Sequence, residues 1–304
     1  MHVHGGEERR ALGIAFGLIV ALMVGEIVAG IVGHSLALLS DAAHMLTDAG
    51  AIALGLFALR LAGRPSGGNL TFGLRRAEVL SAQANGATLL VLAGLISYEA
   101  IRRLVTPVDT GGWTMVVVGC AGILVNILAT RELARADRDN LAVEGSFQHV
   151  LTDLFAFIGT VIAGGVIVAT GFTRADPIAS LFVVALMLRA AYGLLRDSGR
   201  ILLEAAPAGM DVDAIGAALI ADPRVMSVHD LHVWQIGSGF PALSAHVLVR
   251  PGDDCHAVRR DLEQLLRHRF ELRHTTLQVD HVQPSAQAVQ LGEAVVRRTP
   301  ADRR

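Results

Sequence analysis

The sequence predicts a protein with six transmembrane helices followed by a small cytoplasmic α+β domain. Of its 304 residues, 52% are hydrophobic and only 18% are charged, and the mean hydropathy is +0.50. These values are typical of chains that cross a membrane several times. Six apolar runs occupy the first two thirds of the chain, each near the roughly 20 residues that a bilayer requires. From about Pro207 the composition changes to that of a globular domain.

The chain divides into four predicted parts. Residues 1–10 form a polar N-terminal tail, residues 11–200 hold the membrane spans, residues 207–283 form the globular domain, and residues 284–304 are expected to be disordered. The predicted spans are Ala11–Gly33, Leu36–Ala62, Ala77–Val105, Trp113–Leu133, Val143–Thr170 and Pro177–Leu195. Segments rich in Gly, Pro, Ser or charged residues separate them, as expected for loops that leave a membrane.

Arginines set the predicted orientation, because cytoplasmic loops are enriched in basic residues. With the N-terminus in the cytoplasm, the outer loops receive Arg102, Arg103 and Arg174. The inner side receives eleven: Arg9, Arg10, Arg60, Arg64, Arg75, Arg76, Arg131, Arg135, Arg138, Arg196 and Arg200. The sequence therefore predicts that both termini and the globular domain are cytoplasmic.

The globular domain is predicted to be one sheet with two helices on one face. Its elements are, in order, a helix over Asp211–Ala221, strands over Val225–Ile236 and Leu243–Val249, a helix over Asp253–Glu271 and a strand over Thr275–Val282. Asp253 is the expected N-cap of the second helix. This αββαβ order is typical of small α+β sandwiches.

Charge and cysteine content exclude two other classes. The net charge of -2 argues against nucleic-acid binding. The two cysteines, Cys120 and Cys255, lie far apart in different parts of the chain, so no disulfide framework is expected. We also expect no bound cofactor.

Ionisable residues interrupt two of the apolar runs at matching positions. His44 and Asp48 stand four residues apart in the second run, and His149 and Asp153 repeat this spacing in the fifth. Residues four apart share one face of a helix, and ionisable groups within a membrane are costly unless they face a partner or a cavity. A single pair of this kind is explained by an interhelical hydrogen bond or a buried ion pair as well as by a metal site. Two pairs together predict a shared site.

The predicted depths allow the two pairs to meet, because the second and fifth spans cross the membrane in opposite directions. Asp48 lies 12 residues into its span, about 18 Å at 1.5 Å per residue. Asp153 lies 10 residues into its span, about 15 Å from the other side. Both are near the middle of a hydrocarbon core about 30 Å thick. Two imidazoles and two carboxylates are a ligand set that Zn²⁺ accepts in a tetrahedron.

Such a site can exchange a divalent metal ion for protons. All four ligands must be deprotonated to bind metal, and histidine titrates near neutral pH, so both states are accessible in a cell. Asp41 lies two helical turns from Asp48, toward the outer face. It is expected either to support a ligand or line the exit path, or to make a structural contact.

Four short motifs accompany the two His-x-x-x-Asp pairs. They are His34-Ser35-Leu36-Ala37-Leu38-Leu39-Ser40-Asp41, Thr71-Phe72-Gly73, Arg76-Ala77-Glu78 and His229-Asp230-Leu231-His232-Val233-Trp234. Each motif alone is weak, whereas their order and positions together are specific. On these residues the chain resembles the zinc-transporting branch of the cation diffusion facilitator family, from about residue 10 to about residue 283.

The resemblance implies a transporter and not an enzyme. It implies export of Zn²⁺, with Cd²⁺ or Co²⁺ as further candidates, from the cytoplasm across the plasma membrane in exchange for H⁺, by alternating access. The transport site would be His44, Asp48, His149 and Asp153. The resemblance also implies a homodimer with ferredoxin-like cytoplasmic domains. Arg76 and Glu204 match positions where the family places a charge pair that links the subunits.

The resemblance further implies a regulatory zinc site in the cytoplasmic domain. The residues at family ligand positions are His229, His246, His256 and Asp280. A further ligand position is occupied by Gln278, a departure for which Cys255 or His281 are candidate replacements. His232 has the opposite strand parity to His229 and is expected to face elsewhere. The alternative is that these histidines are solvated surface residues.

Three alternatives to zinc transport remain at this point. Transport of Mn²⁺, Fe²⁺ or Ni²⁺ uses similar ligands, and affinity order does not choose among them. A membrane metallohydrolase is disfavoured, because a catalytic zinc keeps an open position and four ligands would close this site. A metal sensor is disfavoured because no output module follows residue 283.

Overall fold

The computed structural model describes residues 4–32, 36–106, 111–136, 138, 140–282 and 296–297. Within the first two helices, the side chains of residues 4–7, 29–30, 32, 36–44 and 47 lie outside this description. The chain separates into two compact units, Met1–Gly199 and Arg200–Arg304.

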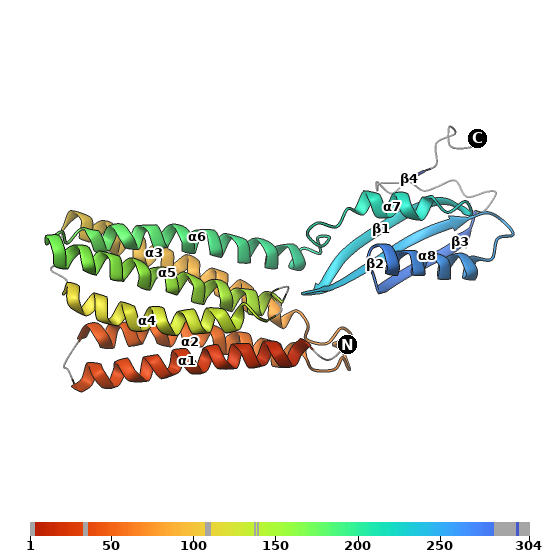
Figure 1. Cartoon of the computed structure of the whole chain (residues 1–304). Helices are drawn as coiled ribbons and strands as arrows, with labels where there is room; N and C mark the ends of the chain where they lie inside the picture. Colours follow the sequence, from red (N-terminus) through yellow and green to blue (C-terminus); the bar gives the residue numbers. More distant parts are fainter. Residues whose placement is uncertain are drawn as a thin grey trace. The chain divides into compact units, whose positions relative to one another are not determined.

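Six long helices make up the described part of the first unit (Figure 1), and the last of them, α6, ends three residues after it. They are α1 (His4–Val32), α2 (Leu36–Ala62), α3 (Ala77–Val105), α4 (Gly112–Leu133), α5 (Leu141–Thr170) and α6 (Ala175–Leu202). Glu8–Val28 of α1 and the whole of α3, α4, α5 and α6 are long and apolar enough to cross a membrane. The 27-residue α2 is also long enough, and side chains over its first nine residues are not described. The predicted helical membrane domain is confirmed.

The helices α5 and α6 are longer than their apolar runs. Helix α5 begins at Leu141 because the Asn140 side chain caps it, accepting a hydrogen bond from the Ala142 amide at 2.9 Å. The Asn140 amide also donates to the buried Glu78 carboxylate of α3 at 2.8 Å. Helix α6 continues to Leu202, since the charged residues after the apolar run are compatible with helix.

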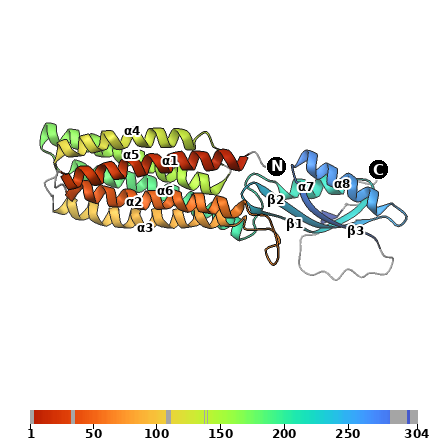
Figure 2. The same cartoon turned by 90° about the horizontal axis from the view of Figure 1, so that it is seen from below.

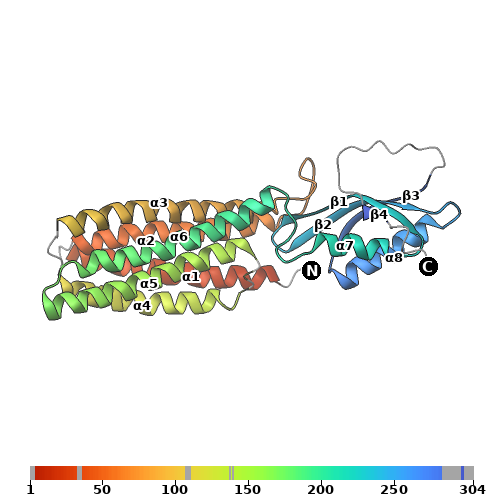
Figure 3. The same ribbon diagram turned by 90° about the horizontal axis from the view of Figure 1, so that it is seen from above.

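The six helices lie side by side (Figures 2 and 3). Two hydrophobic clusters hold them together. One cluster joins α1, α2, α4 and α5, and its largest buried side chains include Leu12, Ile19, Met45, Ile52 and Leu133. The other joins α3 to α6 through Leu89, Val183, Met187 and Leu194. The first cluster surrounds the helices that carry the predicted ligands.

Glycines allow α4 and α5 to approach closely. A Cβ atom at Gly164 would lie 2.8 Å from the Gly112 carbonyl oxygen and 2.9 Å from Met115 Cβ, whereas a Cβ at the adjacent Gly165 would meet nothing within 4 Å. We expect Gly164→Val to destabilise the protein by about 1–3 kcal/mol, because it overpacks this contact. Gly165→Val is the matched control and should be near neutral. Thermal stability of both detergent-solubilised variants tests this, and equal melting temperatures would contradict it.

The second unit holds a four-stranded sheet and two helices. Its elements are α7 (Val212–Ile220), β1 (Val225–Gly237), β2 (Phe240–Val249), α8 (Cys255–Arg269), β3 (His274–His281) and β4 (Val296–Arg297). The strand order is β3-β2-β1-β4, with β2 and β3 parallel and the other pairs antiparallel. The predicted αββαβ order is confirmed, and β4 adds a fourth strand at the β1 edge. The rest of residues 284–304, where disorder was predicted, lies outside the described residues.

Both helices cover the same face of the sheet (Figures 2 and 3). Ile215 and Leu219 of α7 and Leu262 of α8 belong to one core with the odd-numbered β2 residues Leu243 and Val247. Because side chains alternate along a strand, the even-numbered β2 residues lie on the opposite, open face. This separation decides which of the predicted cytoplasmic ligands can meet.

The N-cap of α8 is Asp254, and the prediction of Asp253 was wrong by one residue. The Asp254 carboxylate accepts hydrogen bonds from the amides of His256, at 2.9 Å, and Ala257, at 3.1 Å. These bonds, chiefly the one from Ala257, hold the pKa of Asp254 below its ordinary value. Two adjacent aspartates satisfy the capping pattern equally well in sequence, so only geometry separates them.

Candidate metal centre

Helices α2 and α5 bring Asp48, His149 and Asp153 together inside the membrane domain. One potential ligand atom from each lies within 4.8 Å of the others. His149 Nε2 is 2.8 Å from Asp48 Oδ1 and 3.9 Å from Asp153 Oδ2. Asp48 is 4% exposed and His149 1% exposed, so the contact is shielded from solvent. This places three of the four predicted transport-site residues at one point.

Small residues allow the two ligand-bearing helices to approach. A Cβ atom at Gly55 of α2 would lie 3.0 Å from Ser146 Oγ and 3.6 Å from the Ala142 carbonyl oxygen of α5. On another side of α5, a Cβ at Gly145 would lie 3.2 Å from Asn85 Nδ2 of α3. Both contacts lie within two turns of His149 or Asp48, so they fix the spacing between helices where the ligands meet.

The contact between His149 and Asp48 is a hydrogen bond between an imidazole and a carboxylate, two kinds of group that can also bind metal. Two ligands that share one tetrahedral zinc ion, each about 2.0–2.1 Å from it, lie about 3.3 Å apart. The observed 2.8 Å is shorter and suits a proton held between Nε2 and Oδ1. His149 Nδ1 is buried and has no hydrogen-bond partner among the described residues. The same atoms can therefore hold either a proton or, after a small separation, a metal ion.

The remaining predicted residues of α2 are His44 and Asp41. Both belong to the helix, and His44 precedes Asp48 by four residues. Their side chains lie outside the described residues. The assignment of His44 as the fourth ligand and the role of Asp41 therefore stay predictions.

A second group with metal-binding potential lies on the open face of the cytoplasmic sheet. His229 and Asp230 of β1 and His246 of β2 each offer a ligand atom within 4.8 Å of the others. The two imidazole rings have centroids 5.2 Å apart, and His246 Nδ1 is 4.0 Å from Asp230 Oδ2. All three residues are partly exposed, so ions can reach them from solvent.

A β-bulge explains why Asp230 joins this group. His229 pairs with His246 and His232 pairs with Ser244, so β1 has one more residue than β2 between these pairs. Asp230 takes a left-handed conformation there, with φ of 51°. Because of the extra residue, His229 and His232 both pair with even-numbered residues of β2, so their side chains lie on the same face of the sheet. The prediction that His232 faces elsewhere was wrong for this reason.

The other predicted cytoplasmic ligands do not join this group. Asp280 lies on the open face of β3, where its carboxylate accepts a hydrogen bond from Gln278 at 2.8 Å. His256 lies in the first turn of α8 and is exposed. Cys255 and His281 contact each other on the helix-covered side, so they do not replace Gln278, which pairs with His246 in the sheet.

The two residues of the predicted charge pair lie at helix ends. Arg76 occupies the N-cap position of α3. Glu204 follows the end of α6 and has a positive φ of 59°. They belong to different units of the chain, and their pairing stays a prediction.

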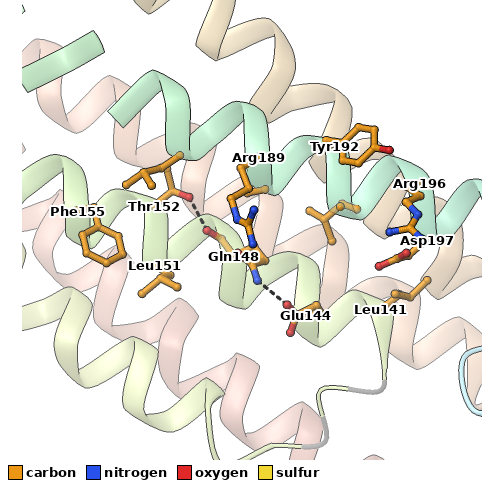
Figure 4. Close-up of a pocket in the computed structure, with 14 residues that line it drawn as sticks. Leu141, Glu144, Gln148, Leu151, Thr152, Phe155, Arg189, Tyr192, Arg196 and Asp197 are labelled. Carbon is orange, nitrogen blue, oxygen red and sulfur yellow. Dashed lines mark hydrogen bonds between the residues drawn. The ribbon is translucent and has the colours of Figure 1, made fainter. Parts of the chain in front are cut away.

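A cavity of about 460 Å³ lies between α5 and α6 (Figure 4). Its polar lining includes Glu144, Gln148, Arg189, Arg196 and Asp197. The Gln148 side-chain amide donates to the Glu144 carboxylate at 2.6 Å, and the Gln148 backbone carbonyl oxygen accepts a hydrogen bond from the Thr152 hydroxyl at 2.7 Å. Asp48, His149 and Asp153 are not among the described residues that line it, so the cavity is separate from the ligand group.

Comparison with known families matches nearly the whole chain. Residues 12–203 match the cation efflux transmembrane domain, and residues 207–282 match the cytoplasmic domain of cation efflux proteins. These two matches place the C-terminal domain in the cytoplasm of a multi-pass membrane protein.

Curated relatives align over most of their length. The chain is 38% identical to the zinc transporter ZitB of Escherichia coli over 282 residues, which is 92% of this chain and 90% of that protein. It is 35% identical to the cadmium, cobalt and zinc/H⁺-K⁺ antiporter of Bacillus subtilis over 285 residues, 92% and 91% of the two chains. It is 36% identical to the metal cation efflux system protein CzcD of Cupriavidus metallidurans over 284 residues, 92% and 89% of the two chains.

These matches agree with the site inside the membrane domain. Buried imidazole and carboxylate groups at one point on two membrane helices are the chemistry that a cation carrier requires. The family is one of transporters and not of enzymes. The chain therefore belongs to the cation efflux family, also called the cation diffusion facilitators, and is a cation efflux transporter.

Proposed function

We propose that this protein exports Zn²⁺ from the cytoplasm across the plasma membrane in exchange for H⁺. The observation that carries the proposal is the buried contact among Asp48, His149 and Asp153. With His44 as the fourth ligand, the site would hold two imidazoles and two carboxylates. Two carboxylates balance the charge of one divalent ion, which matters where solvation is poor.

Relatives support the choice of metal. The Escherichia coli relative is named as a zinc transporter, and the Bacillus subtilis relative is named as an antiporter for cadmium, cobalt and zinc. Mixed nitrogen and oxygen ligands suit Zn²⁺ in a tetrahedron. We propose Zn²⁺ as the main substrate, with Cd²⁺ and Co²⁺ as further substrates, and Mn²⁺, Fe²⁺ or Ni²⁺ as the alternatives to test.

Proton exchange follows from the same atoms. Metal binding requires that the proton between His149 Nε2 and Asp48 Oδ1 leave. When the site opens to the outside, protons return to these groups and release the metal. Alternating access around one site therefore couples the two ions, because the site cannot hold both at once.

Transport in proteoliposomes tests this function. Purified full-length protein is reconstituted, a pH gradient is imposed, and uptake of Zn²⁺, Cd²⁺, Co²⁺, Mn²⁺, Fe²⁺ and Ni²⁺ is measured in turn. We expect Zn²⁺ to enter vesicles that are acidic inside, and collapse of the gradient with an ionophore to stop accumulation. Accumulation that is unchanged without the gradient would exclude antiport, and a preference for Mn²⁺ would exclude zinc as the main substrate.

We further propose that the protein is a homodimer regulated by Zn²⁺ on its cytoplasmic domain. His229, Asp230 and His246 form the group that supports regulatory binding. His256 and Asp280 stay candidate ligands from the family resemblance, as does the charge pair of Arg76 and Glu204.

Single-cysteine labelling tests the proposed orientation, in which both termini are cytoplasmic. In a background with Cys120→Ser and Cys255→Ser, we expect a membrane-impermeant maleimide to label Gly111→Cys in intact cells. Ser285→Cys should react only after the cells are opened. The arginine distribution motivates this expectation. The reverse pattern of labelling would overturn the orientation.

A further inference from the structure

The cavity between α5 and α6 contains an arginine at membrane depth. Arg189 lies inside the apolar run Pro177–Leu195 of α6, six residues before Leu195, which is about 9 Å along the helix at 1.5 Å per residue. The cytoplasmic domain follows α6, so this end of the helix is the inner one. A charged side chain at such a depth is costly unless it meets an opposite charge or a polar cavity.

Arg189 and Arg196 line this cavity from one face of α6. They are seven residues apart, so Arg196 lies two helical turns, or about 10 Å, nearer the cytoplasm. Both residues are exposed, and neither guanidinium has an ion pair or a hydrogen bond with the residues that the structure describes. Figure 4 shows Arg189 directed from α6 toward Gln148 of α5. The two arginines are therefore available to an anionic ligand.

The acidic residues that line the cavity do not neutralise both arginines. The Glu144 carboxylate already accepts two hydrogen bonds from the Arg138 guanidinium, at 2.7 and 3.1 Å, and one from Gln148 at 2.6 Å. Asp197 is the other acidic residue of the lining, and it is exposed next to Arg196 in the sequence. Apart from the pair of Glu144 with Arg138, two arginines thus face one carboxylate, which leaves an excess of positive charge.

Gly193 leaves open space between the two arginines. It lies four residues after Arg189 and three before Arg196, on the same face of α6, and it lines the cavity. A Cβ atom at Gly193 would meet nothing within 4 Å. Long arginine side chains bend toward the membrane interface, so both guanidinium groups can approach one phosphate group in this space.

The lining changes from charged to apolar with depth. Glu144 and Arg196 lie toward the cytoplasmic ends of α5 and α6, whereas Phe155 and Leu186 lie deeper in the same two helices. Phe155 is 40% exposed, so its ring offers apolar surface to a ligand. A phospholipid of the inner leaflet has the same order of groups, with its phosphate at the interface and its acyl chains toward the middle of the membrane.

From this arrangement we propose that the cavity binds one anionic phospholipid of the inner leaflet. Its phosphate lies between Arg189 and Arg196, and its acyl chains lie against Phe155 and Leu186. Basic pockets between transmembrane helices on the cytoplasmic side suit such head groups. Charge-assisted hydrogen bonds from guanidinium to phosphate supply the opposite charge that Arg189 requires at its depth. The bound lipid holds α6 against α5, the helix that carries His149 and Asp153.

Native mass spectrometry of the full-length protein in detergent tests this site. Delipidated protein is titrated with phosphatidylglycerol or with phosphatidylcholine of the same acyl chains, and the lipid retained per chain is measured. We expect the parent to retain one phosphatidylglycerol and to bind phosphatidylcholine more weakly. The double variant Arg189→Gln with Arg196→Gln should bind phosphatidylglycerol about tenfold or more weakly than the parent. Arg131→Gln, which changes an exposed arginine in the last turn of α4, is the matched control and should bind like the parent.

A substitution that keeps both charges tests the space between the arginines. Gly193→Leu fills this space and should weaken the retention of phosphatidylglycerol. Gly94→Leu is the matched control, because Gly94 is exposed on α3 and a Cβ atom there would also meet nothing within 4 Å. It should leave retention unchanged. Size-exclusion profiles verify that each variant is folded.

Other occupants of the cavity give different results. Equal binding of the two lipids by the parent, or undiminished binding of phosphatidylglycerol by the double arginine variant, would overturn the proposal. Binding of glycerol phosphate as tightly as the lipid would assign the arginines to a free phosphate and would also overturn it. So would a change from dimer to monomer in the delipidated double variant, because a second copy of the chain would then cover this face. None of these measurements uses transport, so failure here is distinguishable from failure of the proposed transport function.

Discussion

His149→Ala should reduce Zn²⁺ transport to the level of protein-free vesicles. The imidazole is 1% exposed and contacts Asp48 at 2.8 Å and Asp153 at 3.9 Å. Its removal deletes one of four proposed ligands and leaves two acidic side chains facing one another in a poorly solvated site. Zinc uptake into proteoliposomes under a pH gradient measures the effect. Asp48→Ala and Asp153→Ala are expected to have the same result.

Controls separate the loss of a ligand from the loss of the fold. Breaking a buried pair costs roughly 3–5 kcal/mol, so His149→Ala alone could act through stability. His149→Gln keeps a polar side chain that can hydrogen-bond Asp48, yet it removes the imidazole, and it should also fail to transport. His268→Ala, on the exposed surface of α8, is the matched histidine control and should transport at the parent rate. Transport by a correctly folded His149→Gln variant at the parent rate would exclude His149 as a ligand.

The membrane helices were predictable because their ends are marked in the sequence. Helices α2 and α3 begin and end at the predicted residues, next to segments rich in Gly, Pro, Ser or Arg. The later end of α6, at Leu202, was missed since charged residues can continue a helix into water. The meeting of α2 and α5 was predictable from the repeated His-x-x-x-Asp spacing and from the matched depth of its members.

The cytoplasmic ligand group was predictable only in part, because strand parity assumes a regular strand. The bulge at Asp230 adds one residue to β1 and brings that carboxylate to His229 and His246. Neither a glycine nor a proline marks the position, and Asp230 itself adopts the left-handed conformation. An aspartate is among the residues that tolerate this conformation, which is the one signal that the sequence offers.

Long-range pairs of single residues carry no periodic signal at all. Cys255 and His281 are 26 residues apart, and their contact depends on how α8 returns the chain to the parallel strand β3. Both residues are close in sequence to the predicted regulatory ligands, but the sequence does not indicate on which face of the sheet each lies. The register of β3 settles this, since Gln278 and Asp280 share the open face and His281 lies on the other.

His44→Asp should change which metals the protein transports. In the proposed site it replaces two imidazoles and two carboxylates with one imidazole and three carboxylates, a harder and more anionic set. Carboxylates bind through one oxygen or two, so the coordination number is no longer held at four. Larger ions such as Cd²⁺ and Mn²⁺ should then compete better with Zn²⁺. Competition between Zn²⁺ and each of these ions for uptake into vesicles measures the change.

His44→Ala is the comparison that makes this prediction decisive. With three ligands left in a poorly solvated site, this variant should lose transport of every ion, whereas His44→Asp should keep transport with altered preference. If selectivity comes from the ligand set, the ratio of Cd²⁺ to Zn²⁺ uptake must rise in His44→Asp while Asp48, His149 and Asp153 remain essential. Transport of Zn²⁺ by His44→Ala at the parent rate would remove His44 from the site, and the fourth ligand would then have to come from another residue or from water.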